Sequence, residues 1–344
     1  MGVPWYQETV TGETQILSSR IRLARNIKKY PFHQKLSAQD AYAMIDEITE
    51  SVVHANNHKF FHQLNIQALS NTERSVFLEK HIVSFELLQG NLPKGLLISD
   101  DQNISVMLNE EDHIRIQSIQ AGEGMSTAYE VANRIDDLIE ERMEFAFHVD
   151  YGYLTACPTN VGTGMRASYM IHLPCIEKSG KMKELLPKIT KFGIELRGIY
   201  GEGTDSIGDI HQISNRTTLG KSEEDIIQGL QNVTKIVLEQ EMQARENMLV
   251  TQRSALEDSI YRAYGLLKHS RIISSKEAMA HLSNVRLGYS MGLLTEQHPP
   301  KQIYQIMMEI QSGHLQRLAG REMQEQERDI ARASYLREIF SKVV

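Results

Sequence analysis

The pattern of apolar and polar positions changes character after about residue 220 of the chain. Before that point, short apolar stretches alternate with polar residues at a period of two, which is typical of half-buried strands. The segment 94–120 is predicted to form strands joined by turns, of which 104–108 and 114–119 flank a polar turn. A further strand is expected at 210–215.

Helical spacing of apolar residues predicts three helices within this first part. A helix over 38–57 follows a Ser37 cap, and a second, over 126–144, begins at one of two hydroxyl residues that can cap it. A Lys-rich helix is expected over 181–191. Each lies between strand-like stretches, so the first part of the chain mixes helices and strands.

From residue 222 to the C-terminus, long helical patterns rich in Gln, Glu, Met and Leu dominate. They are interrupted at 270–275 and at 299–300. We therefore predict a domain boundary near residue 245, with a mixed domain at 1–245 and a helical domain at 246–344.

The stretch CPTNVGTGMRASYM, residues 157–170, follows a strand-like run at 145–155 and carries a thiol, closely spaced glycines and a cation. Gly162 and Gly164 allow backbone N–H groups to approach a ligand, and the planar guanidinium of Arg166 suits phosphate oxygens. The residues alone fit equally well a Gly-rich hairpin that only joins two strands.

Two arginines occur close together near the N-terminus. In an extended segment Arg20 and Arg22 project to one side, with Ile21 and Leu23 on the other, so that two guanidiniums face one polyanion. A solvated basic edge strand would have the same pattern, and the segment alone does not distinguish the two.

Three consecutive acids, Glu110, Glu111 and Asp112, occupy the turn before the strand that carries Arg115. They fit either a solvated turn or a carboxylate cluster beside the Arg115 cation, which is the arrangement that keeps a catalytic base ionised. A later segment, 197–209, has four glycines and is expected to be a loop.

His54, His58 and His62 recur at every fourth position, a spacing that can bind zinc on a helix. No Glu lies between the first two, as it would in a metalloprotease helix, so we expect no protein-bound metal.

Composition narrows the functional classes. The chain of 344 residues is 41% hydrophobic, has no apolar run long enough to span a bilayer and lacks a secretory signal. Its only cysteines, Cys157 and Cys175, do not suggest a disulfide framework, and a cytoplasmic location is expected. The formal charge of −7 disfavours nucleic acid and membranes as partners.

Arginines that can bind anions, together with the acids, match the requirements of phosphoryl transfer. In that reaction cations neutralise the phosphates and carboxylates orient the nucleophile. Neither a Walker A sequence nor the HRD and DFG motifs of common protein kinases is present. The arginines lie in separate segments, at Arg20, Arg22, Arg115, Arg166 and Arg197.

The segments SSRIRLARN, NEEDHIRIQ, CPTNVGTGMRA and RGIYGE…GDIHQISNRTTLG resemble the successive signatures of the guanidino phosphotransferases, the family of creatine and arginine kinases. The resemblance covers about residues 15–240 and implies an α+β fold, with an antiparallel sheet flanked by helices, followed here by an all-α domain. The short N-terminus, the added helical domain and the motif RDIARA resemble the McsB-type protein-arginine kinases of Gram-positive bacteria.

This resemblance implies ATP and Mg²⁺ as cofactors, with Mg²⁺ held by the phosphates and water. The expected nucleotide site contains the five arginines and further residues from four segments. These are Ser19, Ile21, Leu23, His81, Ala167, Ser168, Tyr169, Met170, Gly198, Ile199, Tyr200, Gly201 and Glu202. Gln212 stands where the family usually has an adenine-side Asp, which leaves the base contact open.

The implied catalytic residues are Glu111, Glu202 and Cys157. The two acids are expected to hold the substrate guanidinium and accept its proton, while Glu110 or Asp112 holds Mg²⁺-bound water or Arg115. Cys157 is expected to tune the rate, or merely to shape the turn.

In the helical domain, Arg328, Asp329 and Arg332 match a motif that the resemblance associates with binding phosphoarginine. The two arginines lie four residues apart on one helix face and can hold a phosphoryl group together, although a charged surface helix has the same spacing.

The resemblance implies an ATP-dependent protein-arginine kinase in stress response and protein quality control, which marks proteins for proteolysis. Implied partners are arginine-bearing proteins, among them a heat-shock transcriptional repressor, an activating zinc-binding adaptor and an AAA+ unfoldase. A homodimer or higher homo-oligomer is expected. The alternatives are a small-molecule guanidino kinase and an inactive phosphoarginine-binding adaptor.

Overall fold

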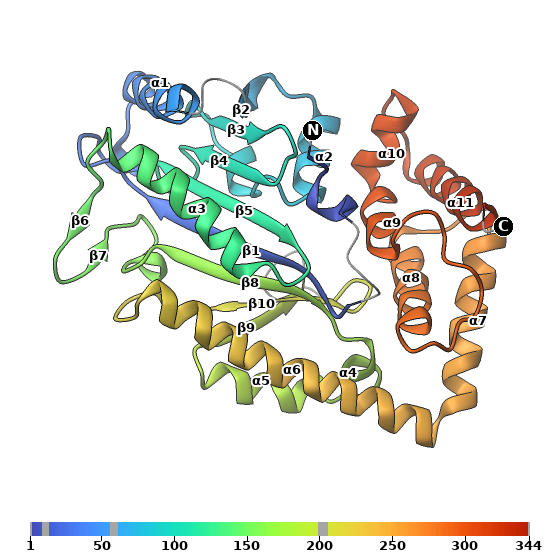
Figure 1. Ribbon diagram of the computed structural model, residues 1–344. Helices are drawn as coiled ribbons and strands as arrows, with labels where there is room; N and C mark the ends of the chain where they lie inside the picture. Colours follow the sequence, from blue (N-terminus) through green and yellow to red (C-terminus); the bar gives the residue numbers. More distant parts are fainter. Residues whose placement is uncertain (1, 9–13, 56–60, 199–205, 343–344) are drawn as a thin grey trace. The chain divides into compact units, whose positions relative to one another are not determined.

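The computed structural model describes residues 2–8, 14–55, 61–198 and 206–342 (Figure 1). Eight strands are hydrogen-bonded into one sheet in the order β2-β3-β4-β5-β1-β8-β10-β9. Their bounds are β1 (Ile16–Arg25), β2 (Phe61–Asn65), β3 (Gly95–Ser99), β4 (Ile104–Leu108), β5 (Ile114–Ala121), β8 (Met165–His172), β9 (Ile194–Gly198) and β10 (Ile210–Asn215). The pairs β2–β3, β3–β4, β4–β5 and β5–β1 are antiparallel, so the predicted α+β class with an antiparallel sheet is confirmed.

The helices mostly follow the predicted segments. They are α1 (Ala38–Ala55), α2 (Asn71–Glu79), α3 (Met125–Glu140), α4 (Pro174–Lys178), α5 (Met182–Thr190), α6 (Glu223–Thr251), α7 (Arg253–His269), α8 (Ser275–Ser290), α9 (Ile303–Glu309), α10 (Ser312–Ala319) and α11 (Glu325–Ser341). The Ser37 cap on α1 is confirmed, because its hydroxyl accepts a hydrogen bond from Asp40 N at 3.1 Å. The predicted hydroxyl cap on α3 is wrong, since Gly124 occupies that position.

The strand expected at 145–155 is also wrong in extent. Only a small hairpin forms there, from β6 (Phe147–His148) and β7 (Gly152–Tyr153). Phe147, Val149 and Tyr151 alternate as they would in a half-buried strand, but all three are exposed. Gly152 has φ +74°, and the chain turns back at this residue. The alternating apolar side chains therefore do not pack against a hydrophobic core.

The described chain divides into two compact units. Unit 1 comprises 1–5, 18–169 and 214–231, and unit 2 comprises 6–17, 170–213 and 232–344. This division does not follow the boundary predicted at residue 245, which lies inside the continuous helix α6. The proposed domains 1–245 and 246–344 therefore stay a prediction.

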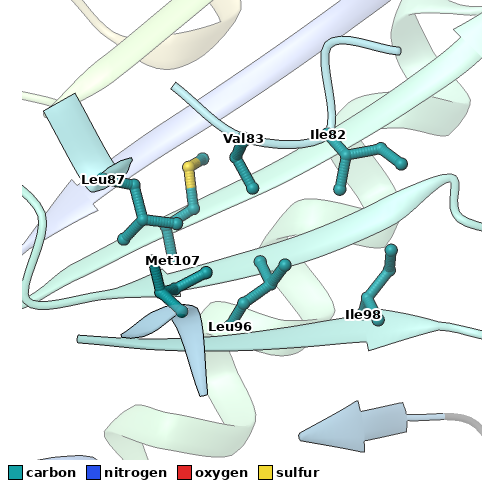
Figure 2. Packing of buried hydrophobic residues seen from close by; sticks show 7 residues of the cluster. Ile82, Val83, Leu87, Leu96, Ile98 and Met107 are labelled. Atoms are coloured by element: carbon teal, nitrogen blue, oxygen red, sulfur yellow. The ribbon is translucent and has the colours of Figure 1, made fainter. Parts of the chain in front are cut away.

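In unit 1, α3 runs along the sheet on one face (Figure 1). On β3, Leu96 and Ile98 point to one face and pack with Met107 of β4, opposite Leu96 in the register. The segment 82–88 covers these residues, as Figure 2 shows for Ile82 and Leu87. Burying aliphatic side chains of this size contributes about 1.5–3 kcal/mol each, so segment 82–88 is firmly held against the sheet.

In unit 2, α8 packs against α7 and supplies a buried polar chain. Arg286 Nη1 donates to His172 Nδ1 at 2.8 Å, so His172 Nε2 carries the proton that it donates to Ser283 Oγ at 2.8 Å. The Ser283 hydroxyl in turn donates to Asp209 Oδ2. Every hydrogen in this chain is donated toward the carboxylate, which connects β8, α8 and the turn before β10.

Arg25, at the end of β1, organises unit 1. Its guanidinium is 1% exposed and donates to Asp136 Oδ2 of α3 from Nε at 3.1 Å and from Nη2 at 2.7 Å. Nη1 donates to the carbonyl of Thr163 at 2.9 Å, and the Tyr153 ring lies 3.6 Å from Cζ. Burial raises the pKa of Asp136 to about 6 against the opposing effect of Arg25. The side chain thus connects β1, α3, β7 and the glycine segment, residues 157–164.

We expect Arg25→Met to destabilise the protein by about 3–5 kcal/mol, because it leaves Asp136 buried without its cation. Urea unfolding measures this loss of stability. Arg134→Met is the matched control, since Arg134 is exposed on α3, the helix that carries Asp136, and this substitution should change stability by less than about 0.5 kcal/mol. Equal effects of the two substitutions would contradict the role assigned to Arg25.

Candidate active site

A pocket of about 230 Å³ opens in unit 1 where β1, β5 and β8 meet the turn before β5 and the glycine segment. Its volume is somewhat smaller than the roughly 300–1,000 Å³ of typical small-molecule sites. Its lining residues are Arg22, Ala24, Ser84, Glu86, Glu111, Arg115, Cys157, Thr159, Asn160, Gly164 and Arg166.

The strand pattern places the arginines. Ile21 and Leu23 are fully buried on one face of β1, which leaves Arg20 and Arg22 on the other, as predicted. Because β1 lies between β5 and β8, the alternative of a solvated edge strand is wrong. Arg115, opposite Ala24 in the register, extends the group onto the neighbouring strand.

Positive charge is concentrated around Arg22. Burial lowers the pKa of its guanidinium well below the usual range, and the nearby charges of Arg20, Arg166 and Arg115 lower it further. Arg22 Nε is buried and has no hydrogen-bond partner among the residues that the structure describes. An anion placed here would satisfy this donor and relieve the mutual repulsion, so the group fits a polyphosphate.

The three acids of the turn have different environments. Glu110 is buried and accepts hydrogen bonds from Arg115 Nη1 at 2.5 Å, from the Ser84 hydroxyl and from Glu111 N at 3.0 Å. Asp112 is fully buried and accepts from Asn26 Nδ2 and from Ala156 N, both at 2.6 Å. These two acids therefore hold other parts of the site, and the alternative of a solvated turn is wrong.

Glu111 is the acid of this turn that lines the pocket. Its side chain is 41% exposed, and one oxygen lies 3.2 Å from Arg115 Nη2. Burial raises the pKa of Glu111, while the Arg115 charge opposes that increase. A carboxylate that keeps an open side, beside a cation, can accept both N–H groups and a proton from a guanidinium.

Cys157 lines the same pocket, at the start of the glycine segment. Its Sγ lies 3.0 Å from Thr159 Oγ1, and its carbonyl accepts from Thr155 Oγ1 at 2.7 Å. Because Asp112 binds the N–H of Ala156, the acidic turn also fixes the position of Cys157.

The glycines permit a close approach, but to the protein's own backbone. Gly164 has φ +62°, and a Cβ there would lie 2.5 Å from the Ala24 carbonyl oxygen. A Cβ on Gly162, with φ +115°, would lie 2.5 Å from the carbonyl oxygen of Thr218. Both glycines seat the segment against β1 and the residues after β10, which the sequence did not reveal.

The other residues predicted for the nucleotide site fall into three groups. In unit 1, His81 adopts φ +57° and lies beside the arginines, where burial and the charges of Arg20 and Arg22 lower its pKa to about 3. Ser168 Oγ accepts from Arg20 Nε at 3.5 Å, and the Ser19 hydroxyl donates to the Gly122 carbonyl at 2.7 Å. Ala167 and Tyr169 are buried in β8.

The second group, Met170, Arg197 and Gly198, belongs to unit 2, where Arg197 forms an ion pair with Glu195. The third group, Ile199, Tyr200, Gly201 and Glu202, lies outside the described residues. Their roles stay predictions.

In α11 of unit 2, Arg332 is 1% exposed, and its guanidinium donates to the carbonyls of Ile310 at 2.9 Å and Ile273 at 3.0 Å and to Asp329 Oδ1 at 2.5 Å. Arg328 Nη1 donates to the Met323 carbonyl at 2.7 Å. Arg332 is therefore a buried connection between helices, unlike the surface arginine that the sequence pattern allows. Binding of phosphoarginine at Arg328, Asp329 and Arg332 stays a prediction.

Sequence reasoning missed Ser84, Glu86 and Arg25. The first two line the pocket from segment 82–88, which carries no recognisable motif, and Arg25 looked like a third member of the basic run. The buried carboxylates that accept from Ser84 and Arg25 belong to Glu110 and Asp136, and these contacts become visible only in the fold.

Among the described residues, no group of three His, Cys, Asp or Glu side chains is arranged to hold a metal ion. Of the three regularly spaced histidines, His62 lies exposed on β2 and pairs with Asp100, and the other two side chains are outside the described part. In the same part of the chain, no helix is both long and apolar enough to cross a membrane.

Comparison with known proteins identifies the family of this chain. Residues 43–244 match the sequence model of the ATP:guanido phosphotransferase C-terminal catalytic domain, and residues 253–344 match that of the protein-arginine kinase McsB C-terminal domain. A lombricine kinase crystal structure has a similar fold, with a TM-score of 0.60 and 23% identity over 70% of this chain and 69% of that one.

Relatives named "Protein-arginine kinase" match nearly the whole chain. The one from Symbiobacterium thermophilum is 42% identical over 97% of this chain and 95% of its own length. Those from Caldanaerobacter subterraneus subsp. tengcongensis and Clostridium acetobutylicum are 41% and 40% identical, over 93% and 97% of this chain and 95% and 98% of their own lengths. The chain therefore belongs to the ATP:guanido phosphotransferase family, and within it to the protein-arginine kinases that carry the McsB C-terminal domain.

Proposed function

We propose that this chain transfers the γ-phosphoryl group of ATP to arginine side chains of proteins. The observation that carries the proposal is one pocket whose lining contains the open carboxylate of Glu111 together with Arg22, Arg115 and Arg166. A guanidinium needs a base and an orienting anion, and a triphosphate needs cations, so one pocket serves both reactants.

In the proposed reaction, a terminal nitrogen of the arginine side chain attacks the γ-phosphorus in line with the leaving ADP. An N–P bond forms as the bond from phosphorus to the β,γ-bridging oxygen breaks, and the attacking nitrogen gives its proton to Glu111. The arginines stabilise the charge that spreads over the phosphoryl oxygens. Glu202 is proposed as a second acid, and Cys157 as a residue that tunes the rate.

Mg²⁺, bound by the nucleotide phosphates and water, would supply additional neutralisation of their charge. We further propose a cytoplasmic enzyme of stress response and protein quality control. Its partners would be a heat-shock repressor as substrate, a zinc-binding adaptor and an AAA+ unfoldase, and it would form a homo-oligomer. These partners follow from the family resemblance alone.

Incubating the chain with an arginine-bearing protein, Mg²⁺ and ATP should place acid-labile phosphate on protein arginines, detected by mass spectrometry. In Glu111→Gln, kcat should fall by about 10²–10⁴-fold, because the base is lost. Glu130→Gln is the matched control, since Glu130 is exposed on α3. Phosphate on free guanidino compounds alone, or on no acceptor, would contradict the proposal.

The pH profile should identify the base. Because Glu111 must be ionised to act and burial raises its pKa above the usual range, kcat/KM should fall on the acid side at a higher pH than for an ordinary Glu. Arg115→Met removes the opposing charge and should move this limb to still higher pH. A shift to lower pH in this variant would refute the assignment.

Arg22→Met should weaken ATP binding by about 10–100-fold, since it removes a charge-assisted contact worth about 1.5–3 kcal/mol. Isothermal calorimetry with ATP measures the affinity, and thermal unfolding without nucleotide reports the fold. Without ATP the variant should be at least as stable as the wild type, because one of four repelling cations has been removed. An unchanged ATP affinity would exclude Arg22 from the phosphate site.

A further inference from the structure

Glu86 is a second carboxylate in the pocket lining, and the reaction described above does not use it. It begins the short 3-10 helix Glu86–Leu88, and it is exposed, whereas Glu111 is partly buried beside Arg115. Of the two acids in the lining, Glu86 is therefore the one placed nearer to solvent, at the outer part of the pocket.

The backbone around Glu86 is firmly held. Lys94, itself 8% exposed, donates from Nζ to the Glu86 carbonyl at 2.6 Å. Ser84 Oγ donates to Glu110 and accepts from Leu87 N at 3.2 Å, which joins this segment to the acidic turn. Leu87 is fully buried in the cluster of Figure 2, so Glu86 lies between two anchored residues.

The charge of Glu86 acts on the site. Burial is the main reason why the pKa of Glu111 is raised, and the negative charge of Glu86 adds to that effect. The Glu86 carboxylate forms no ion pair within the described ranges, although the nearby Lys94 cation offsets part of its charge. Glu86 therefore adds negative charge to a lining in which Arg22, Arg115 and Arg166 make the phosphate side positive.

An acceptor arginine enters with its guanidinium toward Glu111, and its α-carbon end lies toward the pocket opening. In an arginine at the C-terminus of a chain that end carries a carboxylate, which would approach the like charge of Glu86, whereas in free arginine the neighbouring α-ammonium offsets the repulsion. In an arginine inside a chain the same carbon carries a neutral amide, which Glu86 does not repel. One side chain at this position is therefore able to distinguish the two kinds of acceptor.

We propose that Glu86 is a specificity-determining residue that selects arginines inside a chain by repelling acceptors with an uncompensated carboxylate next to the arginine side chain. This inference rests on the proposed function, because it assumes that the pocket receives a guanidinium.

The test compares Nα-acetylarginine with its amide, which differ only in the carboxylate, and an arginine inside an uncharged peptide. We measure kcat and KM for each with the wild type, Glu86→Gln and the control Glu130→Gln. Glu86→Gln should raise kcat/KM for Nα-acetylarginine relative to its amide by about fivefold, mainly through KM. The ratio of amide to peptide, and all ratios in Glu130→Gln, should stay as in the wild type.

Two results would overturn the inference. Equal losses on all three acceptors in Glu86→Gln would mean that Glu86 holds the guanidinium itself, and an unchanged ratio of acid to amide would mean that it has no part in selection. Failure of the proposed function is a separate result, because the wild type would then phosphorylate neither the peptide nor the amide.

Discussion

The ion pair between Arg25 and Asp136 is the interaction on which unit 1 depends. It is almost fully buried, and the same guanidinium also reaches the Thr163 carbonyl and the Tyr153 ring. A buried pair of this kind is weak evidence for stability by itself, because desolvation offsets its attraction. The ion pair acts here mainly by positioning, because the planar guanidinium of Arg25 holds β1, α3 and the glycine segment in fixed relative positions. Two of these three elements, β1 and the glycine segment, line the pocket.

A second constraint is that the three acids in the turn at 109–113 make different contacts. Three adjacent carboxylates would repel one another in solution, but the fold gives two of them hydrogen-bond donors in the protein interior. Glu110 is committed to Arg115 and Ser84, and Asp112 to Asn26 and Ala156. Glu111 alone keeps an open side toward the pocket, which makes it the acid available to a substrate.

The opposite problem arises on the strands. Arginines on neighbouring strands repel one another and depress the pKa of Arg22, an arrangement that costs stability until an anion arrives. Such a site is preorganised for phosphate, because the strands hold the arginines in place and little reorganisation is needed on binding. Glu86 adds a second carboxylate to the lining of this pocket, beside that of Glu111.

The sequence by itself determined the strands at 104–108, 114–119 and 210–215, the long helices, the alternation that puts Arg20 and Arg22 on one face, and the family. These follow from local periodicity and from motifs whose residues are adjacent in the chain. It misread 145–155, because alternating apolar residues indicate a strand whether or not a core covers them. Only the tertiary structure decided which acid is open, why Gly162 and Gly164 are needed, that Arg332 is buried, and that Ser84 and Glu86 join the pocket. These depend on hydrogen bonds and burial between segments far apart in the sequence, which no local pattern encodes.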